Sequence, residues 1–587
     1  MKMKTIYKVL GLLAVSAGIS SCSSDYLDQP PITSLTDYQV GESIEAARAA
    51  LYGTCQAMYN GFYQDNNDRS NSGEAWFQTY YGDSGSPDFW DSLLYGYQSE
   101  LQLWNLMLRN TFWASQNAWM YGYNIIGQAN SILAVIDNVP ADKNEIDFVK
   151  AQCLTLRAHA CIRLMQVYGP RYEDSDGGKA YCIILRSEPG TDPLPLSSYA
   201  DCMEYIYKDL NQAISLFEGS TVQRKYGYEP DINIAKGLYS RIALLNHDWQ
   251  LAAQMAKEAR QFYPIMSADE YLEGFADANG EWLWYNDMDN SYVGYASWGA
   301  SYACNGWYAT AYNWSGAGCI SFKLYDQIYE RYPNDVRCEL FWTPDKGNKY
   351  VELGIKREDF WNPQMVNTEY GYMWGPKMNQ NISAAISLFA AHMNPAPSYF
   401  TESAFGVNTE LTDDMAKSVT GRKRWFDNLP SSSINTCQPG AQLKFWSYPS
   451  LTYASSHPFM RSAELLLNEA EAQMELGNES AARELLIELN ENRIENYSCT
   501  LSGTELRDEI RLYRRMELWG EGDTWFSFKR WNLGVTRTAW KANDPESDTF
   551  LSAYEGSWGP EWGNGWRFRI PTTETNYNPL VADQLNE

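Results

Sequence analysis

The chain has 587 residues, which allows roughly two to four domains of ordinary size and a substantial buried core. Its 46 basic and 73 acidic residues give a formal net charge of −27, which argues against non-specific nucleic-acid binding and against docking on an anionic lipid surface through a basic patch. With 44% hydrophobic residues the chain is not disordered, and its 42 Tyr, 23 Trp and 21 Phe exceed the needs of core filling.

The N-terminus carries an export signal. Lys2 and Lys4 precede an apolar run over residues 9–19, which as a helix would rise roughly 16 Å and cannot cross a hydrocarbon core of about 30 Å. Ile-Ser-Ser then precedes Cys22, which resembles the bacterial lipobox, whose cysteine is acylated. We predict a signal peptide over residues 1–21, lipidation of Cys22 and a tether over residues 22–40. The alternative is an ordinary secretory signal with a chance cysteine.

Ten further cysteines follow, without a Cys-x-x-Cys pair or the spacing of a metal knuckle. Cys153 and Cys161 lie about 12 Å apart on a predicted helix, too far for a disulfide. We expect most of the ten to be small buried hydrophobic residues. One or two disulfides are compatible with export, but the sequence does not select the pairs.

Helical periodicity dominates residues 41–264. Apolar residues recur every three or four positions over 125–136, 149–167, 203–217, 234–245 and 252–262. The second helix is expected to stop before Gly169, and Asp201 is a plausible cap of the third. Ala252 and Ala259, with Pro264 five residues later, have the spacing of a tetratricopeptide helix hairpin.

A second hairpin is predicted over residues 463–489, with its turn at Gly477 and Asn478. The signature Trp and Tyr positions of tetratricopeptides are not kept, so a generic helix hairpin is the alternative. Between these helical blocks, over about 265–455, periodicity disappears and Gly, Asn, Tyr, Trp and Pro are abundant. We predict long excursions with a few short strands and helices, packed on a rigid scaffold.

The most specific motif lies near the C-terminus. It reads Arg-Arg-Met-Glu-Leu-Trp-Gly-Glu-Gly over residues 514–522 and continues with Trp-Phe at 525–526 and Lys-Arg-Trp at 529–531. Supporting pieces are Tyr-Leu-Asp at 26–28, Arg-Ala at 157–158, Tyr-Gly at 168–169, Ile-Pro at 570–571, Glu574, Asn-Pro at 578–579 and Gln584. Together they resemble the SusD/RagB family of outer-membrane nutrient-binding lipoproteins of Bacteroidetes.

Two residues of this block depart from the family pattern: Thr524 replaces a frequent Arg, and Ser527 replaces a frequent Asp. Arg514 and Glu517 are spaced to pair on one helix face. Such a cluster could grip a ligand, but we expect a buried structural network that anchors the terminal helix, which agrees with the role of this region in the resembled family.

The resemblance implies a mainly α protein, in which about four tetratricopeptide-like hairpins carry a large irregular ligand-binding region. The expected division is a single domain over residues 41–587, with a helical scaffold over 41–264 and 456–535, a loop-rich binding region over 265–455 and an irregular segment over 536–587. The resemblance also implies a lipid-anchored protein exposed on the outer membrane, with a SusC-like TonB-dependent β-barrel transporter as its partner. The cargo of this family is usually an oligosaccharide, less often a peptide.

Aromatic residues are concentrated between positions 282 and 314, where eleven of 33 residues are Trp or Tyr although the chain average of 15% predicts about five. The small residues between them cannot cover the rings, so we expect several to be exposed. Sugar rings stack on such platforms while sparse polar groups bind their hydroxyls. In the resembled family an aromatic from an N-terminal loop joins those of the central region. We therefore predict ligand contacts for Trp90, Trp298 and Trp307, with Tyr295, Tyr302 and Trp314 behind them. For any single Trp, a core position is the alternative.

Catalysis is not predicted. An all-α glycosidase would need two carboxylates at a defined separation, and 73 acidic residues supply candidate pairs by chance alone. The sequence contains no nucleophile elbow, His-Glu-x-x-His or phosphate loop. Stacking on nucleic acid would need a cationic groove, and only Lys323 closely follows the aromatic run.

No cofactor is predicted either. Asp287, Asp289 and Asn290 hint at Ca²⁺, but the Gly and distal Glu of an EF-hand loop are missing, so a structural Ca²⁺ stays open. The four histidines are isolated and are expected to lie on the surface or in the core: His159, His247, His392 and His457.

Overall fold

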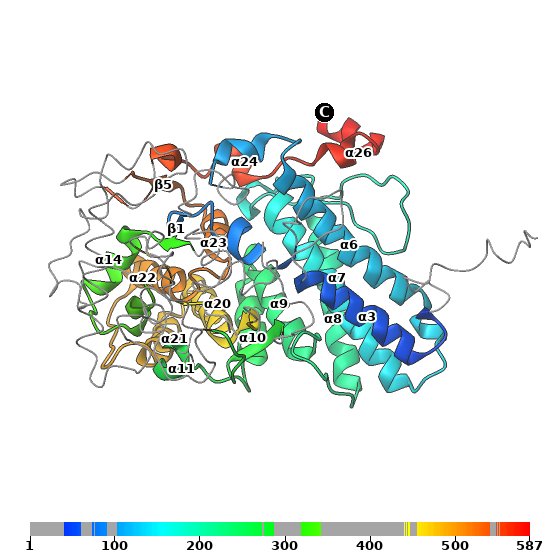
Figure 1. The fold of residues 1–587 in the computed structure, drawn as a ribbon, viewed down its shortest axis with the longest axis horizontal. Coiled ribbons are helices and arrows are strands. Elements are labelled where there is room, and N and C mark those ends of the chain that lie inside the picture. Colours follow the sequence, from blue (N-terminus) through cyan, green and yellow to red (C-terminus); the bar gives the residue numbers. More distant parts are fainter. Residues whose placement is uncertain are drawn as a thin grey trace, which may run out of the picture.

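A computed structural model describes residues 40–59, 73–74, 77–90, 102–272, 275–286, 318–341, 440, 442, 444–445, 455–539, 547–548, 550 and 552–586. The protein is mainly helical, as predicted. Figure 1 shows one array of helices that runs from α3, α6, α7 and α8 through α9 and α10 to α20, α21 and α22. Within the described residues, no helix is both long enough and apolar enough to cross a membrane.

The N-terminal half is built on α3 (Ile44–Tyr59), α6 (Trp113–Val135), α7 (Lys143–Tyr168) and α8 (Tyr199–Gly219). Helix α7 packs between α6 and α8 and buries most of its 26 residues. Its first turn is capped by the Asp142 side chain, which accepts a hydrogen bond from the Asn144 amide. The helix ends at Tyr168, directly before Gly169, as the sequence predicts.

Helix α8 begins earlier than predicted. Ser198 is its N-cap, because its hydroxyl accepts a hydrogen bond from the Asp201 backbone amide. Asp201 in turn accepts a 2.6 Å hydrogen bond from the Ser198 hydroxyl. Asp201 therefore holds the third helical position, and the cap lies three residues before it.

The first predicted hairpin is formed by α9 (Ile232–Leu245) and α10 (Trp249–Ala259). Ala252 and Ala259 are fully buried, which lets the two helices approach closely, as their spacing predicts. The apolar stripe ends at Ala259, however: Phe262 was expected to continue it and is 74% exposed. Residue 262 lies beyond the end of α10, where helical periodicity no longer sets the direction of its side chain.

The C-terminal half contains α20 (Ser462–Glu475), α21 (Glu479–Glu491), α22 (Gly503–Glu517) and α23 (Thr524–Arg530). The hairpin of α20 and α21 confirms the second sequence prediction, and its turn uses Gly477 at φ +80°. Helix α10 packs against α20 and so joins the two halves.

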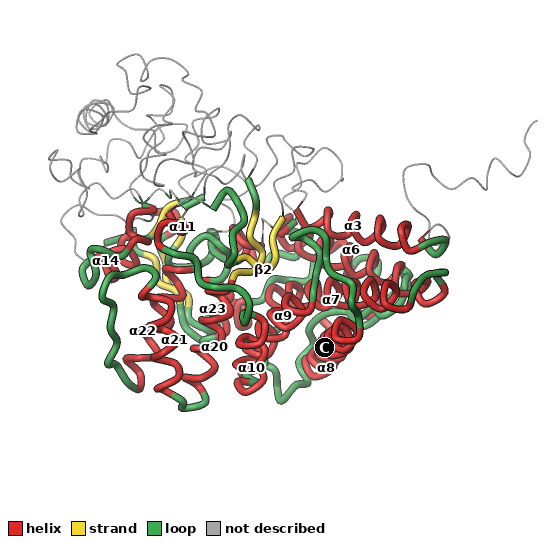
Figure 2. The backbone as a smooth tube through the Cα atoms, turned by 90° about the horizontal axis from the view of Figure 1, so that it is seen from below, coloured by secondary structure: helices red, strands yellow, loops and turns green. Residues whose placement is uncertain are grey.

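Within the described residues, three two-stranded antiparallel sheets accompany the helices. They pair β1 (Phe89–Trp90) with β3 (Cys319–Ile320), β2 (Trp282–Asn286) with β4 (His457–Arg461), and β5 (Val535–Arg537) with β6 (Gly556–Trp558). Strand β2 lies beside α9 (Figure 2). The remaining elements are short: η2 (Phe77–Tyr81), η3 (Trp104–Leu108), η4 (Ile136–Asn138), η5 (Tyr172–Asp174), α11 (Ala268–Leu272), α14 (Phe322–Tyr329), η7 (Val336–Leu340), η12 (Ser552–Tyr554), α24 (Trp562–Trp566), α25 (Thr572–Thr575) and α26 (Pro579–Asn586).

The final segment returns to the first helices. Arg567 donates hydrogen bonds to the carbonyls of Tyr168 and Tyr181, and Phe568 donates its amide to the Val167 carbonyl. Trp119 on α6 donates to Glu574 at 3.1 Å. The C-terminal end of α7 is thus completed by residues from the far end of the chain.

Tryptophans fill the core in clusters. Trp104 stacks on Trp558 at 4.8 Å and meets Trp566 edge to face at 4.6 Å, and Trp566 contacts Trp525 at 5.6 Å. The cysteines follow the expectation of small buried residues, because every cysteine in the described ranges is buried: Cys55, Cys153, Cys161, Cys182, Cys202, Cys319, Cys338 and Cys499. The buried tryptophan clusters account for part of the excess of aromatic residues in the sequence.

Candidate functional site

Of the six aromatic residues predicted to contact ligand, Trp90 lies in the described part of the chain. It belongs to β1, pairs with Cys319 of β3 and is 0% exposed, which is the exposure of a core residue. The predicted lipidation site Cys22 and the possible Ca²⁺ ligands at 287–290 lie outside the described residues, as do Tyr295, Trp298, Tyr302, Trp307 and Trp314. The ligand-binding roles of all six stay predictions.

The first two rings of the aromatic run belong to the core. Trp282 and Trp284 lie in β2 and are 2% and 0% exposed. The Trp284 indole donates a 2.8 Å hydrogen bond to the Tyr228 carbonyl and packs edge to face on Phe459 of β4. The unbroken apolar triplet at 282–284 was a usable signal, since a strand covered on both faces does not alternate.

Two small sheets hold the ends of the run. Strand β2 ends at Asn286 and β3 begins at Cys319, so residues 287–317 start from one sheet and return to the other. The β1–β3 sheet is tied to the C-terminal block through Asp88, which pairs with Arg515 at 2.5 Å. The Trp519 indole donates to the Asp88 carbonyl at 3.0 Å. Sequence reasoning did not identify Asp88, because its partners are more than 400 residues away.

A buried cluster of charges surrounds Glu517, the last residue of α22. The Glu517 carboxylate is 0% exposed and meets Arg493 at 3.0 Å and both Arg337 and Arg461 at 3.3 Å. Burial raises the pKa of Glu517, but the guanidinium groups of Arg493, Arg461 and Arg337 outweigh it and hold this pKa well below its usual value. The carboxylate therefore stays ionised.

The sequence prediction of a buried structural network in this block is confirmed, but the predicted pair of Arg514 with Glu517 is wrong. Arg514 pairs with Asp523 at 2.6 Å and donates to Asn468 at 2.8 Å. Glu517 is surrounded by arginines from other elements, while Asp523 lies in the loop after α22, within reach of Arg514. Tertiary partners thus replace the local pair.

Lys444 connects the loop-rich region to the same block. Its ammonium donates to the carbonyls of Glu517 and Trp519, each at 2.9 Å, and to the Glu521 carboxylate at 2.6 Å. Burial lowers the pKa of Lys444, and Glu521 opposes that effect only in part. A cation at the last carbonyls of α22 is favourable, because the helix dipole is negative there.

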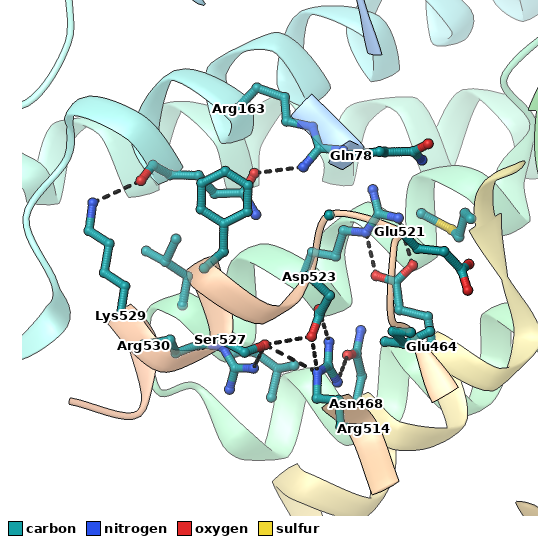
Figure 3. Close-up of a pocket in the computed structure, with 18 of the residues that line it drawn as sticks. Gln78, Arg163, Glu464, Asn468, Arg514, Glu521, Asp523, Ser527, Lys529 and Arg530 are labelled. Atoms are coloured by element: carbon teal, nitrogen blue, oxygen red, sulfur yellow. Dashed lines mark hydrogen bonds and ion pairs between the residues drawn. The ribbon is translucent and has the colours of Figure 1, made fainter. Parts of the chain in front are cut away.

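A cavity lies where the two helical halves meet (Figure 3). About 910 Å³ of space here is not filled by protein atoms, and this volume includes open solvent. The walls come from α7, α9, β4, α20, α22 and α23. The charged lining includes Arg163, Arg241, Glu464, Arg514, Asp523 and Lys529.

The charges of this wall are arranged in pairs. Arg241 on α9 meets Glu464 on α20 at 2.6 Å and also donates to the Phe459 carbonyl. Arg163 on α7 pairs with the buried Glu74. Burial raises the pKa of Glu74, but Arg163 and His159 outweigh it and hold this pKa well below its usual value. Basic side chains outnumber acidic ones in this wall, although most of the arginines are paired with a carboxylate of the protein.

Lys529 meets backbone rather than carboxylate. Its ammonium donates to the Gln166 carbonyl at 2.8 Å and the Gly169 carbonyl at 3.0 Å, at the C-terminal end of α7. Burial and then the positive charges of Arg567 and Arg171 lower its pKa well below the usual value. The helix end supplies the compensating negative potential.

Two carboxylates of the wall are each held by an arginine: Glu464 by Arg241 and Asp523 by Arg514. In the part of the chain that the structure describes, no group of three His, Cys, Asp or Glu side chains is placed to hold a metal ion. The cavity escaped sequence reasoning because Arg241 and Glu464 are 223 positions apart.

Comparisons with known proteins agree with this architecture. A family model described as "SusD family" matches residues 280–587, and a second one, described as "Starch-binding associating with outer membrane", matches residues 25–244. No curated protein matches the chain.

Solved structures share the fold. One is a SusD-like carbohydrate binding protein from Bacteroides vulgatus, with 17% identity, a TM-score of 0.66, and coverage of 92% of this chain and 98% of that one. A putative sugar binding protein from the same species has 19% identity, a TM-score of 0.63 and the same coverage. A SusD superfamily protein from Bacteroides thetaiotaomicron has 18% identity, a TM-score of 0.61, and coverage of 92% and 99%. Because the first family model spans more than half of the chain, this protein belongs to the SusD family.

Proposed function

We propose that this protein is a cell-surface lipoprotein that captures an oligosaccharide and delivers it to a SusC-like TonB-dependent transporter in the outer membrane. The observation that carries the proposal is membership of the SusD family, supported by a fold shared with proteins described as carbohydrate binding or sugar binding. The description of the second family model, starch-binding and associating with the outer membrane, supports both the ligand class and the location.

The binding surface is proposed to be the aromatic run that starts at β2 and returns at β3. Trp298 and Trp307 are proposed to supply its central faces. Trp90, on β1 next to β3, is 0% exposed and would have to become accessible to contribute. The supporting rings are Tyr295, Tyr302 and Trp314. The two small sheets and the Glu517 cluster below them would hold this surface in a fixed position, which lowers the entropy lost on binding.

Peptide cargo is the alternative, and the charged cavity is the observation that could favour it. A peptide would favour a deep and charged cavity over a flat aromatic surface, and the cavity between the helical halves is charged. Its ions already have partners within the protein, however, so a charged peptide would have to displace them. We therefore favour a glycan.

The test is an array of glycans and peptides probed with the protein started after Cys22. Binding to glycans and not to peptides is expected. Incubation with the same glycans should release no new reducing ends, and turnover would contradict the proposal in favour of a glycoside-active enzyme. Preferential peptide binding would support the alternative cargo.

The anchor is tested separately. Cys22→Ala should leave the fold intact but release the protein from membranes, because each buried acyl CH₂ contributes about 0.8 kcal/mol and the variant has no acyl chain. Fractionation of cells that lack the transporter measures this, since a partner would otherwise retain the protein. A variant that still sediments with membranes rules out the lipid anchor.

A further inference from the structure

Three aromatic rings stack at the surface of the scaffold, one from η5, one from the turn after α9 and one from the first residue of α10. The ring of Tyr172, in η5, lies 4.4 Å from that of His247, and His247 stacks on Trp249 at 4.5 Å with an interplanar angle of 23°. Tyr172 is 45% exposed, so the outer end of this stack faces solvent. We call these three residues the aromatic stack.

The backbone at the centre of the stack is strained. His247 has φ 56°, in the left-handed region that a helix end usually assigns to glycine. It lies two residues after α9, where its amide donates to the Leu244 carbonyl and the Asp248 amide donates to the Ala243 carbonyl. A side chain at such a position has a cost, and strain of this kind concentrates at functional sites. Here it places the imidazole between Tyr172 and Trp249.

The stack adjoins the cavity between the helical halves. Tyr172 is part of the cavity wall, together with its neighbour Arg171 and with Leu245, which precedes the strained turn. An exposed aromatic residue in the wall means that the cavity reaches the surface here. A flat ring beside a recess with hydrogen-bonding groups is the usual anatomy of a sugar site.

The charged groups beside the stack have partners within the protein. Arg171 pairs with Asp174 at 2.5 Å, and Glu173 lies 3.7 Å from the His247 ring. Burial lowers the pKa of His247, which Glu173 partly offsets, so the imidazole is neutral near pH 7. Because Arg171 already has a carboxylate partner, this edge of the cavity matches the hydroxyl groups of a neutral sugar better than a carboxylate or sulfate.

We propose that the exposed face of Tyr172 and the adjoining cavity wall form a second carbohydrate site, which takes one or two residues of a neutral glycan. This second site rests on the proposed function, because its ligand class follows from that function. It shares no residue with the predicted aromatic platform, which consists of Trp90, Tyr295, Trp298, Tyr302, Trp307 and Trp314. It lies on the helical scaffold, between η5 and the turn that follows α9.

The test uses the full-length protein in detergent and a panel of maltotriose, cellotriose, xylotriose and mannotriose, with binding followed by calorimetry and by saturation-transfer NMR. The double variant Trp298→Ala/Trp307→Ala removes the platform and should retain weak binding of at least one trisaccharide. Adding Tyr172→Ala should weaken that residual binding about tenfold or abolish it, whereas Tyr172→Phe keeps the ring and should retain it. Tyr577→Ala removes a tyrosine that is 82% exposed and is the matched control.

The outcomes separate the two proposals. No residual binding in the double variant, or residual binding that Tyr172→Ala leaves unchanged while the protein melts normally, overturns the second site. If Tyr172→Ala alone removes all binding and the double variant binds like the wild type, the second site stands and the predicted platform fails. If Tyr172→Ala lowers the melting temperature, the folded wild type is tested instead. Transfer of saturation from the Tyr172 ring to the trisaccharide supports the site, and the absence of this transfer rejects it.

Discussion

Glu517 and Glu464 are both helical carboxylates paired with arginine, but their surroundings differ. Glu517 is fully buried among Arg337, Arg461 and Arg493. Glu464 has Arg241 as its ion-pair partner at 2.6 Å and lies in the wall of the cavity, with 12% of its side chain exposed.

The contrast shows how one kind of interaction serves two purposes. Where water is excluded, an unpaired charge is very costly, so several partners must hold the group and the cluster fixes the relative positions of distant elements. Where a cavity admits water, solvent can replace a lost partner. The Glu517 cluster is therefore suited to stability, and the cavity wall is suited to exchanging partners with a ligand.

The largest expected effect is that of Glu517→Gln. A neutral amide would remove the carboxylate that three buried guanidinium groups share, so we expect the free energy of unfolding to fall by about 3–5 kcal/mol. Urea denaturation at pH 7 measures this loss. The control is Glu505→Gln, an exposed residue of the same helix, which should change stability by less than about 0.5 kcal/mol. Equal effects of the two changes would contradict the comparison.

A buried histidine predicts a pH dependence. Burial lowers the pKa of His457 to about 3, so the folded state keeps the ring neutral at pH values where the unfolded chain, with a pKa near 6.5, binds a proton. The stabilisation is complete above pH 6.5 and is lost as pH falls toward 3, by up to about 1.4 kcal/mol per pH unit. His457→Leu should flatten the change in unfolding free energy between pH 7 and pH 5. An unchanged slope would mean that other groups dominate.

Glu464→Gln should have a smaller effect than Glu517→Gln. Because the cavity can supply water to Arg241, we expect a loss of about 1.5–3 kcal/mol, the range of one hydrogen bond to a charged group. The same denaturation series measures it. A loss as large as that of Glu517→Gln would show that the cavity wall is as dry as the core.

The smallest effect on stability is expected for the proposed platform. Trp298→Ala or Trp307→Ala should leave the melting temperature nearly unchanged and abolish measurable glycan binding, since weak binding of this kind amounts to roughly 4–7 kcal/mol in total. Trp284→Ala, from the same aromatic run, should instead lower stability by about 3–5 kcal/mol, because that ring is fully buried. Calorimetric titration and thermal melting distinguish the two. If the Trp298 and Trp307 variants melt early and their folded fraction still binds glycan normally, the ligand site lies outside the proposed platform.

The helical scaffold was predictable because its information is local. Apolar periodicity and small residues such as Ala252 and Ala259 gave both hairpins, and Gly169 gave the end of α7. Errors arose where a neighbouring residue could play the same part, as when Ser198 rather than Asp201 capped α8.

The site could be predicted only in part, since composition does not show which rings are covered. Trp282 and Trp298 occur in one aromatic run, yet the burial of Trp282 depends on β4, which follows some 170 residues later. The partners of Glu517 come from three distant segments, so spacing along α22 suggested Arg514 instead. Sequence patterns of this kind carry no information on such distant contacts.

The return of the C-terminal segment to α7 bears on the order of events during synthesis. The Tyr168 carbonyl receives its hydrogen bond from Arg567, 399 positions later, so the end of this central helix cannot be completed until nearly the whole chain is available. Folding of the N-terminal half is therefore expected to finish after synthesis rather than during it. Chains stopped before residue 560 should remain open to protease near Tyr168, and protection of that site in such chains would refute this order.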